Sequence, residues 1–134
     1  MLGAGEGDAM LNVVDTSGWL EYLADTPQAE HFATAIEDTE HLLVPAIVMY
    51  EVFKKVMIGA GEDRAIQAIG FLRQGRVLVV DEPVSMLAAR LSVQHKLPMA
   101  DALIYATAQL HGATVLTQDA HFQGLPGVRY VVKG

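Results

Sequence analysis

Short apolar runs alternate with segments of helical periodicity along this chain, and that alternation restricts the fold more than any other feature. The runs that predict strands are 11–15, 42–44, 76–80, 114–117 and 128–132. Between them, apolar residues recur at helical spacing, most clearly over 46–58, 64–72, 84–95 and 99–111. Strands separated by helices favour a parallel sheet, since a helical crossover returns the chain to the same end of the sheet. We therefore predict an α/β fold, a three-layer α/β/α sandwich with a mainly parallel central sheet of four to five strands.

The size and composition of the chain predict one domain with its own core. The sequence has 134 residues, of which 51% are hydrophobic, and a typical domain has about 100–150 residues. Residues 1–9 carry neither the basic nor the apolar part of a signal peptide. We expect residues 1–9 to be a flexible extension or tag and residues 10–134 to form a single domain.

The absence of cysteine removes several classes of site at once. With no Cys there are no disulfides, no thiolate zinc sites and no cysteine nucleophile. The longest apolar stretch, 42–50, is broken by Pro45 and is far shorter than the ~20 residues of a membrane span. We expect a cytoplasmic protein that does not enter the membrane.

The formal net charge is −7, which by itself argues against binding to nucleic acid, because phosphate contacts usually require a basic surface. That argument weakens if several acids lie at one site. Such a cluster would hold divalent cations, and the cations rather than lysines would meet the phosphate. The net charge therefore excludes neither a protein that binds nucleic acid through bound cations nor one that binds no nucleic acid.

Three aspartates stand where the chemistry of such a fold is expected. Asp15 ends the first predicted strand, and Asp119 lies two residues beyond the fourth. Ligands of an open α/β sheet bind beyond the carboxyl ends of its strands, although either acid could equally cap the next helix. Asp101 lies in the first turn of a helix that is apolar on nearly every side, where a buried charge needs a partner such as a metal.

Glu51 is harder to interpret from the sequence. It lies in the predicted helix 46–58, on the side opposite an apolar stripe that includes Val52, Val56 and Met57. Lys54 and Lys55 stand three and four residues later and could pair with it, so a solvated surface position is an alternative to a functional one.

Four short motifs together resemble the PIN-domain family, in particular the VapC-type toxins of toxin–antitoxin pairs. The motifs, in chain order, are Val14-Asp15-Thr16-Ser17, the helix start at 44–52 that contains Glu51, the run 97–104 that contains Asp101, and the run 115–122 that contains Asp119. They are in family order and spacing, and the match extends from about residue 11 to residue 132. No single motif is specific, but four in register are informative together.

The resemblance implies a function and a set of site residues. Asp15, Glu51, Asp101 and Asp119 would bind one or two Mg²⁺ or Mn²⁺ ions, and carboxylate oxygens are the ligands that such cations prefer. The bound ions would activate water for hydrolysis of an RNA phosphodiester. Thr16, Ser17 and Thr117 would hold the carboxylates in place, and Lys54 and Lys55 are candidate RNA contacts. The family further implies a homodimer and a cognate antitoxin that obstructs the acidic site.

Other functions remain as alternatives at this point. A phosphoryl-transfer domain of the haloacid-dehalogenase kind would need a second Asp two residues after Asp15, where Ser17 stands. A receiver-like phosphoacceptor domain would need paired acids after the first strand. A catalytically silent PIN scaffold would have lost one of the four acids. Asp81 is interpreted as an acid that starts a helix, and His121 as a packing residue.

Overall fold

The computed structural model describes residues 10–134, so the prediction for residues 1–9 lies outside the described part of the chain. Its centre is a five-stranded sheet in which every neighbouring pair is parallel, in the order β3-β2-β1-β4-β5. The strands are β1 Asn12–Val14, β2 Leu42–Pro45, β3 Arg76–Leu78, β4 Thr114–Thr117 and β5 Val128–Tyr130. The predicted α/β fold is confirmed, and the sheet has the upper number of strands expected.

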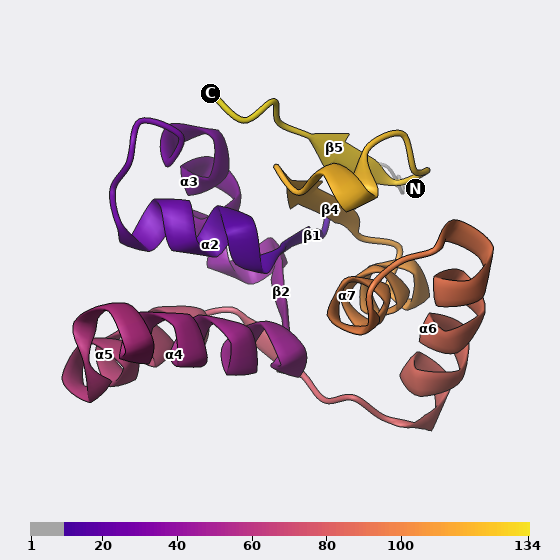
Figure 1. The fold of residues 1–134 in the computed structure, drawn as a ribbon, viewed down its shortest axis with the longest axis horizontal. Coiled ribbons are helices and arrows are strands. Elements are labelled where there is room, and N and C mark those ends of the chain that lie inside the picture. Colours follow the sequence, from indigo (N-terminus) through magenta and orange to yellow (C-terminus); the bar gives the residue numbers. More distant parts are fainter. Residues whose placement is uncertain (1–9) are drawn as a thin grey trace.

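Helices connect the strands and cover the sheet on both sides. They are α2 Thr16–Leu23, α3 Glu30–Glu37, α4 Ala46–Ala60, α5 Glu62–Leu72, α6 Glu82–His95 and α7 Met99–Leu110, with short 3₁₀ turns η1 Thr39–His41 and η2 Ala120–Phe122. Figure 1 shows α2 and α3 on one side of β1 and β4, and α6 and α7 on the other. The α4–α5 hairpin lies beyond β2, where α4 contacts both α2 and α7.

The beginning of α2 is packed too closely for a side chain at its third residue. A Cβ atom on Gly18 would lie 2.6 Å from the ring of Phe32 on α3 and 2.7 Å from Val14 on β1. Glycine is therefore required by space rather than by backbone conformation. The close contact holds the first turn of α2 against the end of β1, where Asp15 lies.

Helix α7 is the buried helix that the sequence predicted. Six of its residues are buried, namely Ala102, Ile104, Tyr105, Ala106, Thr107 and Ala108. It contacts β1, β2 and β4, so it lies across the middle of the sheet. Its first turn therefore carries Asp101 toward the carboxyl ends of the central strands.

The apolar stripe predicted for α4 is only partly correct. Within the predicted stripe Val52 is fully buried, but Met57 is 41% exposed, whereas the exposed Ile58 lies on the opposite side of the helix, as predicted. The exposure arises because the C-terminal half of α4 extends past the sheet and packs mainly on α5. No helix within residues 10–134 has the length and apolar character needed to cross a membrane.

Candidate metal centre

Asp15 follows the last residue of β1 and is the N-cap of α2. It is 2% exposed, and its Oδ1 accepts hydrogen bonds from the Ser17 hydroxyl at 2.7 Å and the Gly18 N–H at 3.2 Å. Burial raises the pKa of the Asp15 carboxyl to about 6, even though hydrogen bonds from Ser17, Thr117 and Gly18 favour the charged form. The site therefore holds a carboxylate whose charge is poorly solvated, and a cation would compensate it.

Asp119 lies just beyond β4 and caps η2. Its Oδ1 accepts the His121 N–H at 2.9 Å, and its own N–H donates to the buried Thr117 hydroxyl at 2.8 Å. Because Thr117 also hydrogen-bonds Asp15, this hydroxyl lies between the two strand-end acids. Thr117 thus links the Asp15 carboxylate to the backbone of Asp119, across the neighbouring parallel strands β1 and β4.

Asp101 approaches the same place from α7. Its pKa is raised to about 7, first by burial, then by repulsion from Asp119 and a hydrogen bond with it, with Asp15 adding a smaller repulsion. His121 opposes the shift by favouring the charged form. Three carboxyl groups that are far apart in sequence therefore influence one another directly at the carboxyl ends of β1 and β4.

Candidate ligand atoms of Asp101, Asp119 and His121 lie within 4.8 Å of one another. The His121 Nδ1 atom is 2.8 Å from Asp119 Oδ1 and 3.3 Å from Asp101 Oδ2. The expectation that His121 is a packing residue is wrong, since its side chain is 56% exposed. The sequence signal that could have found it is its place two residues after a strand-end acid, within a 3₁₀ turn.

Glu51 reaches this region indirectly. It is half-buried on α4, and its Oε1 accepts a hydrogen bond of 2.5 Å from the Thr16 hydroxyl, across 35 positions of sequence. Thr16 directly follows Asp15, so the bond ties α4 to the beginning of α2. Among the described ion pairs, none joins Glu51 to Lys54 or Lys55. Lys54 instead lies 5.7 Å from the centre of the Tyr50 ring.

The four predicted acids therefore differ in how closely they contact one another. Asp101 and Asp119 are in direct contact, Asp15 is within electrostatic reach of both, and Glu51 is connected through Thr16. The donor set of the inner three is carboxylate oxygen, which fits a hard divalent cation. Asp81, expected to start a helix, does so: its Oδ1 accepts the Val84 N–H at 3.1 Å at the beginning of α6.

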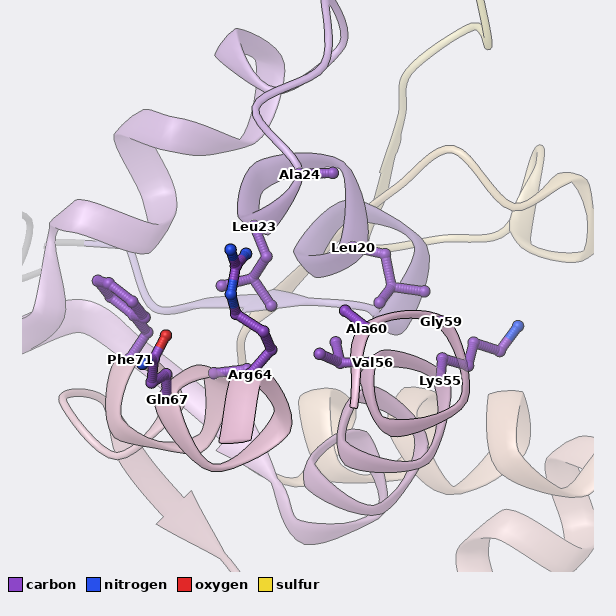
Figure 2. A pocket seen from close by; sticks show the side chains of 11 residues that line it. Leu20, Leu23, Ala24, Lys55, Val56, Gly59, Ala60, Arg64, Gln67 and Phe71 are labelled. Atoms are coloured by element: carbon purple, nitrogen blue, oxygen red, sulfur yellow. The ribbon is translucent and has the colours of Figure 1, made fainter. Parts of the chain in front are cut away.

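An apolar groove lies away from the acids, between α2 and the α4–α5 hairpin. It has a volume of about 500 Å³. Its lining residues are Leu20, Leu23, Ala24, Lys55, Val56, Gly59, Ala60, Arg64, Gln67, Ala68 and Phe71. Figure 2 shows Leu20 and Leu23 of α2 facing α4 and α5, with Arg64 extending from α5 toward α2. Lys55 therefore lies at this groove.

The sequence profile of the PIN domain matches residues 13–128, which includes all four predicted acids. The chain belongs to the PIN-domain family. The family expected from the four motifs is thus confirmed. Among curated proteins, none matches this PIN domain significantly by sequence.

Solved structures with the same fold come from several bacteria. A toxin–antitoxin complex from Klebsiella pneumoniae is 26% identical, with a TM-score of 0.71 over 88% of this chain and 95% of that one. The DNA-bound VapBC complex from Salmonella typhimurium is 18% identical, with a TM-score of 0.74 over 91% and 97%. A Mycobacterium tuberculosis VapC toxin, described as cleaving the sarcin–ricin loop, is 18% identical, with a TM-score of 0.72 over 87% and 96%.

Proposed function

We propose that this PIN domain is a Mg²⁺- or Mn²⁺-dependent endoribonuclease and the toxin component of a type II toxin–antitoxin system. The observation that carries the proposal is the convergence of Asp15, Asp101 and Asp119, two of which have a raised pKa. Such a cluster is costly without a cation and favourable with one. Similar folds occur in toxins of toxin–antitoxin complexes, one of them described as cleaving the sarcin–ricin loop.

The roles of the chain's own residues follow from their contacts. A bound divalent ion would lower the pKa of a water molecule and stabilise the leaving oxygen of a phosphodiester. Asp15, Asp101 and Asp119 would hold that ion, with Glu51 at the rim of the same site. Ser17 and Thr117 orient Asp15 by hydrogen bonds, while Thr16 orients Glu51.

The two lysines differ in their surroundings. Lys54 is exposed on α4 beside the Tyr50 ring, three residues from Glu51, so it suits contact with an RNA phosphate. Lys55 lines the apolar groove and suits a protein partner better. Of the two candidate RNA contacts, we therefore favour Lys54.

The test is cleavage of RNA by the purified chain with Mg²⁺, Mn²⁺ or EDTA. We expect cleavage with either ion, none with EDTA, and none by Asp119→Asn, whose circular dichroism spectrum should match that of wild type. Growth arrest on expression should disappear in the same variant. A folded wild-type protein that cleaves no RNA under any of these conditions would be a catalytically silent scaffold.

The cognate antitoxin is the partner that fits the apolar groove. A groove lined by leucines, Val56 and Phe71 suits the apolar face of an amphipathic helix, and Lys55 and Arg64 suit acidic residues beside that face. Co-expression of the cognate antitoxin should relieve growth arrest by wild type. It should not relieve arrest by Leu23→Arg, which places a charge in the groove away from the acids.

The expected assembly and domain bounds are also part of the proposal. We propose that the chain forms a homodimer, which light scattering would show as twice the chain mass. We propose that residues 10–134 are the functional domain. Deletion of residues 1–9 should therefore leave RNA cleavage unchanged.

A further inference from the structure

The 3₁₀ turn η2 holds the His121 side chain next to two carboxylates without burying it. The adjacent Phe122 is fully buried, and its ring packs edge-on against Tyr105 of α7, with ring centres 6.2 Å apart. Tyr105 is one turn after Asp101 on the same helix. The Phe122–Tyr105 contact therefore fixes η2 relative to the helix that carries Asp101, while His121 remains on the solvent side.

The position of the imidazole is consistent with a ligand set around one ion. Neighbouring ligands of an octahedral ion with bonds of about 2.1 Å are separated by about 3 Å. The distances from His121 Nδ1 to Asp119 Oδ1 and Asp101 Oδ2, 2.8 and 3.3 Å, bracket that separation. The two carboxylates and the imidazole come from α7 and the η2 turn with its N-cap, and their candidate ligand atoms lie within 4.8 Å of one another, with the His121 Nδ1 atom hydrogen-bonded to Asp119 Oδ1.

We infer that His121 is a direct ligand of the ion held by Asp101 and Asp119, and that it makes this site prefer Mn²⁺ to Mg²⁺. The inference rests on the metal site of the proposed function and extends it. Mn²⁺ takes carboxylate and water ligands as Mg²⁺ does, but as a first-row transition ion it also binds at sites that contain nitrogen, whereas Mg²⁺ takes oxygen ligands and retains its water molecules. An imidazole added to the carboxylate ligands therefore discriminates between the two ions, whereas carboxylates alone discriminate between them much less.

The direct test is pulsed electron paramagnetic resonance of the Mn²⁺-loaded, full-length protein. A coordinated imidazole gives a nitrogen coupling to the manganese, and labelling the histidines with ¹⁵N identifies its source. We expect the coupling in wild type and its loss in His121→Gln. The matched control is His41→Gln, since His41 Nδ1 also lies 2.9 Å from a carboxylate, that of Asp38, but outside the metal centre. The control variant should retain the coupling.

Binding constants for the two ions provide the second readout. Loss of a partner that only supports a ligand costs about 10- to 100-fold in metal affinity, so loss of the ligand itself should cost at least that much. We expect His121→Gln to weaken Mn²⁺ binding by about tenfold or more, and Mg²⁺ binding by much less. The variant should fold normally, because the side chain it replaces is exposed.

The outcomes separate this inference from the proposed function. If wild type binds neither ion, both the metal site and the role of His121 are wrong. If wild type binds Mn²⁺ and loses it in Asp101→Asn, but shows no nitrogen coupling, only the role of His121 is wrong. Tighter Mn²⁺ binding by His121→Gln would also overturn the inference, since it would mean that the imidazole competes with the ion.

Discussion

The carboxyl ends of the central strands β1 and β4 and of the edge strand β3 present the same local chemistry. At each of these ends an aspartate caps the turn that follows, and its Oδ1 accepts a backbone N–H. The distances are 3.2 Å for Asp15, 2.9 Å for Asp119 and 3.1 Å for Asp81. As N-cap residues, Asp15, Asp119 and Asp81 are therefore equivalent.

The difference between them is set by the sheet. β1 and β4 are neighbours at its centre, whereas β3 is at the edge, beyond β2. Asp15 and Asp119 therefore share the Thr117 hydroxyl and both act on Asp101. Asp81 stands three residues past the end of β3, after the exposed Val79 and Val80. A capping acid becomes a candidate ligand only where a second strand and α7 bring further carboxylates to it.

The rate of RNA cleavage should distinguish the ends of the central strands β1 and β4 from the end of β3 most strongly. Asp15→Asn keeps the shape and the capping oxygen but removes the charge that would hold the ion, so RNA cleavage should fall by about 100-fold or more. Asp81→Asn, the matched control, should cleave like wild type. Initial cleavage rates on one RNA substrate measure both. Glu51→Gln should reduce the rate less than Asp15→Asn, because Glu51 reaches the centre only through Thr16. Loss of activity in Asp81→Asn alone would reverse the assignment.

Stabilisation by a bound metal ion should give the next largest difference between the central strand ends and the end of β3. At free Mn²⁺ about 100 times the Kd, ligand binding raises the free energy of unfolding by about 2.7 kcal/mol. Thermal melts with and without Mn²⁺ should show this stabilisation in wild type and Asp81→Asn. Asp101→Asn should show little of it. Equal stabilisation of all three proteins would place the ion elsewhere.

In the metal-free protein, the pH dependence of the free energy of unfolding should differ between Asp101→Asn and Asp81→Asn. The folded-state pKa values of Asp15 and Asp101, about 6 and about 7, lie above the ordinary value of 3.8. The folded state therefore retains protons that the unfolded chain has released, so the free energy of unfolding falls as pH rises from about 4 to about 7. Denaturant melts in EDTA at several pH values should show a smaller fall for Asp101→Asn than for wild type. Asp81→Asn should follow wild type, and a rise in stability over this range would contradict the raised pKa values.

Capping alone should give the smallest effect. Asp81→Ala removes the N-cap of α6, which should cost about 0.5–2 kcal/mol in the free energy of unfolding. Its stabilisation by Mn²⁺ should nevertheless equal that of wild type. Denaturant melts with and without the ion measure both quantities, and a reduced Mn²⁺ effect would show that the two regions are coupled.

The sequence by itself determined the elements and the family. Strand and helix positions follow from local periodicity and capping, so the five strands and the buried α7 could be predicted, with differences of a few residues at their ends. Asp15, Asp101 and Asp119 could be predicted as a group because strand ends and helix starts are local features, and four motifs in order resemble a known family. Local periodicity also predicted a buried Met57, which is wrong because the pattern cannot show where the sheet stops covering α4.

Tertiary structure decided which of these local features meet. The bond from Thr16 to Glu51 spans 35 positions, and His121 lies beside Asp101 because Phe122 packs on Tyr105 of α7. Contacts of this kind depend on strand order and helix packing, which are set by burial of apolar surface over the whole domain. An aspartate that caps a helix has the same local sequence pattern at the edge of the sheet as at its centre. Only the packed sheet, with β1 beside β4 and α7 across both, distinguishes Asp81 from Asp15 and Asp119.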